Sequence, residues 1–151
     1  MADTNPEFAI QRLYVKDVSF EAPNTPAVFK EEWKPEINLE INSKAEKLED
    51  NLHEVVLRLT ATAKKAEKVL FVVEVKQAGI FLTKDFSEKD LQQVLGALCP
   101  NILFPYAREL ITRLVTDGGF PALYLAPINF DAIYAQQLAQ QTAQPASTTT
   151  H

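Results

Sequence analysis

Residues 55–75 read VVLRLTATAKKAEKVLFVVEV, and this stretch decides the fold. Its first part, residues 55–63, alternates with period two, which is typical of a β-strand. Residues 69–75 form a second run that is apolar on both sides at its start. The charged turn Lys64–Lys68 between the runs is short, so the two strands are expected to pair antiparallel. A strand that is apolar on both sides also predicts that something covers both faces of the sheet there.

Two more strands are expected upstream of this hairpin. Residues 36–42 alternate cleanly between apolar and polar side chains, and residues 43–51 are expected to form a charged turn or short helix. Residues 8–20 also alternate with period two. In a regular strand both faces of this segment would mix apolar and polar residues. One of the two faces would consist of Phe8, Ile10, Arg12, Tyr14, Lys16, Val18 and Phe20.

The connection between these strands, residues 22–35, is bounded by Pro23 and Pro35 and contains Phe29 and Trp33. Large aromatic side chains contribute little to stability unless they are buried. Two interpretations follow: the aromatics plug one end of the sheet, or they form a wall of a binding groove.

From Ser87 onward the apolar period becomes helical. Ser87 is expected to cap a helix that continues to about Val115, interrupted or kinked at Pro100 and Pro105. Gly118 and Gly119 supply a stop signal. Asn129 is expected to cap a last helix, whose apolar stripe consists of Phe130, Ile133, Tyr134 and Leu138.

The charges are distributed unevenly along the chain. Of the 35 charged side chains, 15 basic and 20 acidic, 30 lie in residues 1–90 and only five in residues 91–151. A segment with so few charges cannot cover itself with a solvated face, so self-association is expected. The net charge of −5 and the lack of a strong basic patch argue against a protein that binds duplex nucleic acid.

The residues do not indicate catalysis or a metal site. His53 lies in a charged stretch and is expected at the surface, and Cys99 is expected to be a buried structural thiol. No spacing of Cys and His suits a metal ion, so no cofactor is expected. The single cysteine, the absence of a signal sequence and the absence of a long apolar run predict a cytoplasmic protein. An enzyme that uses Cys99 as nucleophile stays open as an alternative.

Three blocks in order carry a specific resemblance. They are IQRLYVKDVSFEAPN at residues 10–24, CPNILFPYARE at residues 99–109, and FPAL followed by LAPINFDA at residues 120–132. They resemble the SecB family of bacterial protein-export chaperones, over about residues 8–140. We therefore expect a flexible N-terminus at residues 1–7, a single chaperone domain at residues 8–139, and a disordered tail at residues 140–151.

The resemblance implies an α+β fold. It implies a four-stranded antiparallel sheet with a long crossover connection, then a long kinked helix and a shorter C-terminal helix. It also implies a homotetramer built as a dimer of dimers. By this resemblance the oligomer interface includes Val73, Val75, Gln77, Leu95, Leu98, Cys99 and Ile102.

The implied function is that of an ATP-independent holdase, which keeps precursor proteins unfolded and passes them to the SecA motor ATPase. The positions that match the family's docking site for SecA are Asp17, Glu21, Val72 and Glu74. The groove for clients is expected to be lined by Trp33, Ile37, Leu39, Ile41, Leu125, Phe130, Ile133, Tyr134 and Leu138. A generic oligomeric adaptor for a folded protein partner is the alternative to a holdase.

Overall fold

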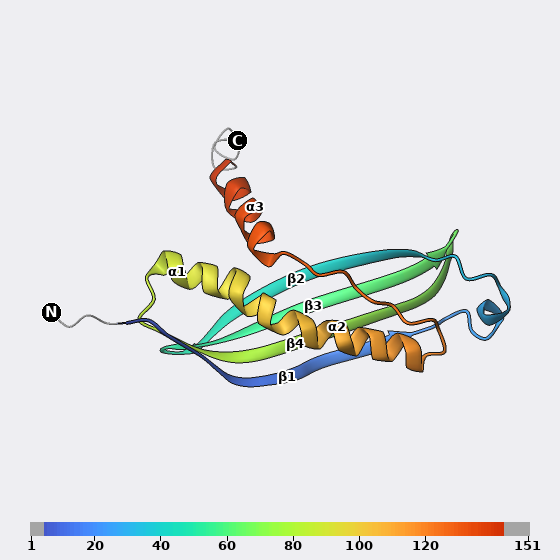
Figure 1. Cartoon of the computed structure of the whole chain (residues 1–151), viewed down its shortest axis with the longest axis horizontal. Helices are drawn as coiled ribbons and strands as arrows, with labels where there is room; N and C mark the ends of the chain where they lie inside the picture. Colours follow the sequence, from blue (N-terminus) through green and yellow to red (C-terminus); the bar gives the residue numbers. More distant parts are fainter. Residues whose placement is uncertain (1–4, 144–151) are drawn as a thin grey trace.

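The computed structural model describes residues 5–143 and contains one four-stranded antiparallel sheet with helices on one side (Figure 1). The strands lie in the order β1-β4-β3-β2, so the long connection between β1 and β2 crosses the full width of the sheet. The strands are β1 Glu7–Glu21, β2 Glu36–Glu49, β3 Leu52–Lys65 and β4 Lys68–Lys84. The helical elements are η1 Ala27–Lys30, α1 Glu88–Gln93, η2 Val94–Leu98, α2 Cys99–Asp117 and α3 Phe130–Ala143. The expected α+β class and strand topology are confirmed.

The hairpin of β3 and β4 forms the centre of the sheet, as residues 55–75 predicted. Its turn is tighter than expected, because both strands extend into the charged stretch and Ala66 takes a left-handed conformation with φ 56°. Alternate residues of β3 are fully buried, namely Val55, Leu57, Leu59, Ala61 and Ala63.

Strand β1 differs from the regular alternation that its sequence predicted. Its pairing with β4 shifts register twice, between Ile10 and Arg12 and between Val15 and Asp17. Each β-bulge adds one residue and so exchanges the two faces of the strand beyond it. The prediction that Arg12, Tyr14 and Lys16 share a face with Phe8 and Phe20 is therefore wrong. With the two bulges, the pairing with β4 instead places six apolar side chains on the side of the sheet that carries the helices. They are Phe8, Ile10, Leu13, Val15, Val18 and Phe20.

Strand β2 is also longer than its sequence predicted. Residues 43–49 continue the strand instead of forming a turn or helix, with Ser43 opposite Leu57 and Ala45 opposite Val55. The long buried strand β3 has backbone N–H and C=O groups along its whole length that need hydrogen-bond partners. Pairing them with residues 43–49 stabilises the sheet by more than the weak strand propensity of these charged residues costs. Because β2 is an edge strand, its charged side chains remain exposed and discourage pairing with other chains.

The helical half follows the predicted caps. The Ser87 hydroxyl accepts a hydrogen bond from the Asp90 amide at 3.2 Å, and the Asn129 side chain accepts one from the Ala132 amide at 3.0 Å. A π-helical turn, η2, precedes Pro100, while Pro105 lies inside α2 without ending it. Because proline cannot donate to the carbonyl four residues earlier, the wide π turn accommodates Pro100. The helix ends at Gly118, and Gly119 has φ 92°, as its glycines predicted.

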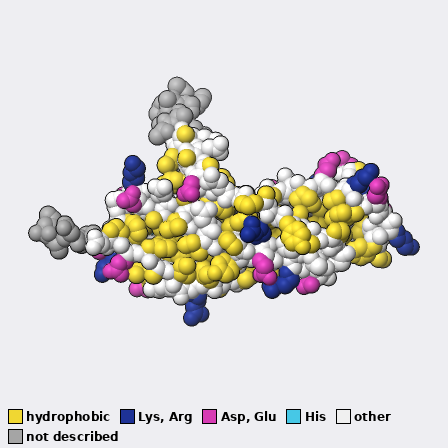
Figure 2. Space-filling model, in the orientation of Figure 1, with side chains coloured by type: hydrophobic (Ala, Val, Ile, Leu, Met, Phe, Trp, Pro, Cys, Tyr) yellow, Lys and Arg dark blue, Asp and Glu magenta, His cyan; other side chains and the backbone are white. Residues whose placement is uncertain are grey.

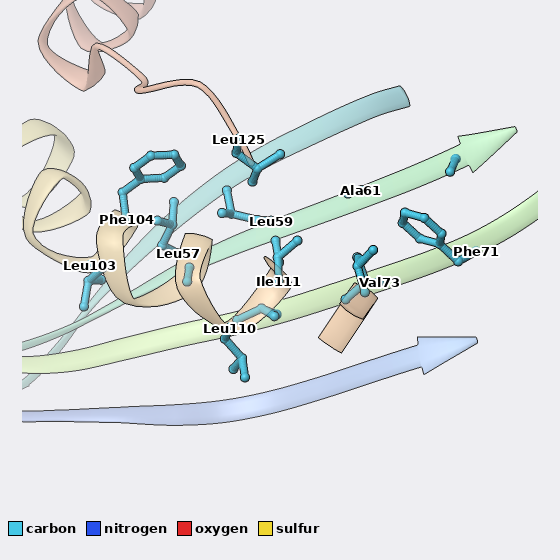
Figure 3. Close-up of a cluster of buried hydrophobic side chains, with 14 of the residues drawn as sticks. Leu57, Leu59, Ala61, Phe71, Val73, Leu103, Phe104, Leu110, Ile111 and Leu125 are labelled. Atoms are coloured by element: carbon cyan, nitrogen blue, oxygen red, sulfur yellow. The ribbon is translucent and has the colours of Figure 1, made fainter. Parts of the chain in front are cut away.

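Helix α2 packs on β4 and β3 and builds the core with them. Figure 3 shows side chains from β3, β4 and α2 converging, together with Leu125 from the connection that returns toward α3. Helix α3 continues to Ala143, so its last turn extends past residue 140, where a tail was expected. The rest of that predicted tail, and residues 1–4 of the predicted flexible N-terminus, lie outside the described residues.

Candidate functional site

The two faces of the sheet have different chemistry. The face under α2, here the covered face, is apolar, and α2 covers mainly β3 and β4. The opposite face, here the open face, carries alternating polar and charged side chains such as Arg58 and Thr60 from β3 and Glu74 and Lys76 from β4. Figure 2 looks onto the covered side and shows hydrophobic side chains across both halves of the molecule.

Four sequence-predicted residues meet on the open face. In the pairing of β1 with β4, Glu21 lies opposite Val72, Ser19 opposite Glu74 and Asp17 opposite Lys76. Directly opposed residues in an antiparallel pair point to the same side. Asp17, Glu21, Val72 and Glu74 therefore share one face, and we call this set the acidic patch.

Members of the acidic patch differ in their partners. The carboxylate of Glu74 accepts from the Arg58 guanidinium at 3.5 Å and from the Thr60 hydroxyl at 3.3 Å. Asp17 and Glu21 are exposed, and neither makes an ion pair within residues 5–143. These two carboxylates are therefore the most accessible acids of the patch.

A partly buried polar network lies beside the acidic patch. The Glu54 carboxylate accepts a short hydrogen bond from the Tyr14 hydroxyl, and its two oxygens accept from Lys16 Nζ at 3.0 Å each. Burial acts to raise the pKa of Glu54, but the hydrogen bonds from Tyr14 and Lys16 outweigh it and lower the pKa below its ordinary value. Burial, with the hydrogen bond to Glu54, raises the pKa of Tyr14 to about 12. The network ties β1 to β3 across the intervening strand β4.

On the covered side, a pocket of about 380 Å³ lies between β2, η2 and α3. Five of the residues predicted for the client groove line it, namely Ile41, Phe130, Ile133, Tyr134 and Leu138. Gly96 brings the helices together here, because a Cβ at this position would lie 2.6 Å from Tyr134 Cδ1. Polar residues such as Asn42, Ser43 and Gln92 also line the pocket, so it is a shallow site of mixed polarity that α3 closes on one side.

The other predicted groove residues lie toward the crossover connection. Trp33 packs on Phe120 with ring centroids 5.8 Å apart and keeps 38% of its surface exposed, while Phe29 lies 5.1 Å from Phe120. Ile37 and Leu39 are on the covered face of β2, and Leu125 is part of the core. Phe29 and Trp33 therefore cover the end of the sheet and still present aromatic surface, while the interpretation that they form a wall of a binding groove stays a prediction. Phe120 was missed, because only the folded connection after Gly119 brings it to this cluster.

The residues expected at the oligomer interface differ in their exposure. Val73, Val75, Gln77, Leu95 and Cys99 are buried inside this chain, because its own helical segment covers them. Their place at a subunit interface stays a prediction. Leu98 is exposed and Ile102 partly buried, and both stay candidates. Exposed apolar residues that the sequence analysis did not select are Ile10, Val15 and Val18 on β1 and Tyr106 on α2.

The two residues considered for chemistry have structural surroundings. His53 is buried, not at the surface as expected, and its Nδ1 lies 2.8 Å from the Thr83 hydroxyl. The hairpin pairing places it on the covered face, which charged sequence neighbours did not reveal. Cys99 is buried as predicted, and desolvation raises the pKa of its thiol to about 12.

Among residues 5–143 no group of His, Cys, Asp and Glu suits a metal ion. None of the helices in the same range is long and apolar enough to span a membrane.

Comparison with known proteins identifies the family. The family model described as SecB, preprotein translocase subunit SecB, matches residues 1–141. The protein-export protein SecB of Hahella chejuensis is 57% identical over 97% of this chain and 92% of its own length, and that of Marinobacter nauticus is 56% identical over 93% and 86%. The fold resembles that of the Mycobacterium tuberculosis Rv1957 SecB-like chaperone, solved with a ChAD peptide from the Rv1956 HigA1 antitoxin, with a TM-score of 0.62, 17% identity, and coverage of 80% of this chain and 90% of that one. The chain belongs to the SecB family of protein-export chaperones.

Proposed function

We propose that this chaperone uses the two faces of its sheet for two tasks. The covered side, with its pocket between β2, η2 and α3 and its aromatic cluster, holds precursor proteins unfolded. The acidic patch on the open face docks on the SecA motor ATPase, and the chain acts in the cytoplasm as a homotetramer without ATP or another cofactor. The observation that carries the proposal is the register of β1 and β4, which gathers the acidic patch on the face opposite the pocket formed with α3.

Client capture is supported by the amount of apolar surface that the covered side leaves accessible. A complex of micromolar affinity needs about 8 kcal/mol, and each well-buried apolar side chain supplies roughly 1.5–3 kcal/mol. Ordering an unfolded client costs several kcal/mol in return. One pocket therefore binds weakly, whereas several subunits on one long chain gain through effective concentration. This arrangement favours long unfolded chains over folded proteins, whose apolar residues are hidden, and so favours a holdase over an adaptor.

Assembly is supported by apolar surface that the chain itself does not cover. Helix α2 lies mainly over β4 and β3, so Ile10, Val15 and Val18 of β1 remain exposed on the covered side (Figure 1). Leu98 and Tyr106 are exposed on the helical segment. Exposed apolar surface of this extent on a single subunit fits a dimer of dimers. Native mass spectrometry should then give four subunits, and a stable monomer at micromolar concentration would contradict this part of the proposal.

The experiment that separates the two tasks reverses charge on the open face. Asp17→Lys with Glu21→Lys should weaken SecA binding at least tenfold, because a basic docking partner would then meet like charge. The matched control is Glu36→Lys with Glu40→Lys, two exposed acids of β2 that pair with Lys64 and Thr60 on the same face near the opposite edge. Binding is measured by titration calorimetry, and holding by the refolding rate of a slow-folding precursor without nucleotide.

The docking proposal predicts that the double variant loses SecA binding and keeps its holding activity, while the control keeps both. Equal loss of both activities in the double variant would indicate misfolding instead of a lost docking site. Equal loss of SecA binding in the control would indicate a general effect of net charge and would remove the specific role of the acidic patch.

A further inference from the structure

A second site lies on the open face, and most of its lining residues are cationic. This pocket has a volume of about 380 Å³ and is lined by Lys16, Asn42, Lys44, Val56, Arg58 and Lys76. Four of these six side chains are basic and none is acidic, in a chain that has 20 acidic and only 15 basic residues. Random placement of charge on an acidic protein does not favour such a grouping.

The pairing of the strands brings these cations together. Lys76 of β4 lies directly opposite Arg58 of β3, and Arg58 lies opposite Asn42 of β2. Lys44 lies opposite Val56, and Lys16 sits at the second bulge of β1. Like charges directly opposite each other destabilise a strand pair, so the pair of Lys76 and Arg58 costs stability in the free protein. An anion bound between them would remove that cost.

Many of the hydrogen-bond donors in this pocket remain available. Lys16 Nζ donates to Glu54, but the Arg58 guanidinium makes one long contact, 3.5 Å to Glu74. Within residues 5–143 the side chains of Lys44 and Lys76 make no ion pair or hydrogen bond. Each lysine carries three donors and each arginine five. The pocket therefore presents a set of unused donors from three strands.

We propose that this pocket binds a multiply charged phosphate anion, such as two or three linked phosphate groups. A guanidinium matches the geometry of phosphate oxygens, and lysines add point charges around it. The volume falls in the range of small-molecule sites. The lining has no aromatic side chain on which a nucleobase would stack, so the phosphate groups themselves are what the pocket recognises. A singly charged anion would neutralise only part of the lining.

The site is distinct from the acidic patch, although the two are neighbours. Glu74 contacts Arg58, and Asp17 lies opposite Lys76, so acidic groups border the pocket without lining it. The proposal does not depend on docking to SecA, because Asp17 and Glu21 contribute none of the lining. Its test uses the free chaperone and small anions only.

The test is titration calorimetry of the full-length protein with orthophosphate, pyrophosphate and tripolyphosphate at matched ionic strength and without divalent cations. Saturable binding is expected, tightest for tripolyphosphate and weaker at higher salt. Lys76→Gln and Lys44→Gln should each raise the dissociation constant about tenfold, because each removes a charge-assisted hydrogen bond. Lys89→Gln is the matched control, since Lys89 is exposed on α1 and remote from the pocket.

Each result decides for or against the site. The proposal is supported if the two pocket variants weaken binding and the control does not. It is overturned if the wild type shows no saturable binding at millimolar tripolyphosphate, or if Lys89→Gln weakens binding as much as the pocket variants. Tighter binding of polyglutamate than of tripolyphosphate, lost in the same variants, would also overturn it in favour of an acidic polypeptide. Lys44 is exposed on an edge strand, so its variant keeps the test valid if Lys76→Gln fails to fold.

Discussion

The two faces of the sheet show how one set of strands serves two purposes. On the covered face, cross-strand neighbours such as Leu59 and Val75 are fully buried under the helices. On the open face, the alternate residues Thr60 and Glu74 remain partly exposed and form polar contacts with each other. Stability is thus concentrated on one face, which leaves the other free to carry charge arranged for binding. Substitutions on the covered face should therefore mainly lower the free energy of unfolding. Substitutions on the open face should mainly weaken the binding of partners.

The largest expected effect is on the free energy of unfolding, at the core of the covered face. Phe71 is fully buried, stacks on Phe20 with ring centroids 5.9 Å apart, and packs in a tilted arrangement against Phe120 with centroids 5.2 Å apart. Phe71→Ala should lower the free energy of unfolding by about 3–5 kcal/mol, through lost apolar burial and the cavity left behind. Thr62→Ala, on the open face of β3, should change it by about 0.5 kcal/mol or less.

Both variants are measured by urea unfolding at one fixed protein concentration, because subunit association makes the midpoint concentration-dependent. A loss at Thr62 as large as that at Phe71 would show that the open face also carries folding energy, and the contrast between the faces would fail.

The central hairpin and the helix caps were predictable from the sequence because their causes are local. Alternation in residues 55–75 gave the pairing of β3 and β4, and the Ser87 and Asn129 side chains act within one turn of their own position. The gathering of Asp17, Glu21, Val72 and Glu74 was anticipated only through the family resemblance. Strand alternation alone predicted that Asp17 and Glu21 share one face of β1. It did not predict that Val72 and Glu74 of β4 lie on the same face.

The features that the sequence did not predict depend on the partner strand. The bulges in β1 have no signature in its own residues, yet they decide which side chains face α2. The length of β2 and the burial of His53 both follow from the extent of β3, whose backbone must be paired on both sides. The cationic pocket draws residues from every strand, so no local pattern marks it.

A smaller effect is expected at the edge of the covered face, where folding and client binding meet. Trp33 is partly exposed on Phe120, so Trp33→Ala removes surface available to a client as well as packing. It should shorten retention of an unfolded precursor roughly fivefold, which corresponds to about 1 kcal/mol. Leu48→Ala is the control, an exposed apolar residue of β2 outside both the pocket and the aromatic cluster.

Retention is measured as the rate at which a labelled precursor escapes to fold. Unchanged retention of the precursor by the Trp33→Ala variant would show that Trp33 has only a structural role and does not contact the client. A matching loss in Leu48→Ala would show that any exposed apolar residue contributes, so no defined groove would exist.

The smallest expected effects are on the pH dependence of the free energy of unfolding. They concern His53 and Glu54, two consecutive residues of β3 that point to opposite faces of the sheet. His53 points to the covered face, where burial first and the nearby charge of Lys47 second lower its pKa below the ordinary value of 6.5. Glu54 points to the open face, where Tyr14 and Lys16 lower its pKa below 4.5. Both folded-state values lie below the unfolded ones, so each group stabilises the protein fully above its unfolded pKa, and this stability is lost as the pH falls.

The pH windows of the two residues therefore differ. The His53 contribution should begin to fall below about pH 6.5, because the unfolded chain then takes up a proton that the buried ring resists, and its slope must stay below about 1.4 kcal/mol per pH unit, the value for one whole proton. The Glu54 contribution should persist until below about pH 4.5, where its bonds to Tyr14 and Lys16 are lost. Urea unfolding from pH 7.5 to 5 should show a slope that His53→Gln flattens and Glu54→Gln leaves in place. The chain has only one other histidine, His151, so His151→Gln is the matched control, and a slope that follows His151 would remove the assignment to the buried ring.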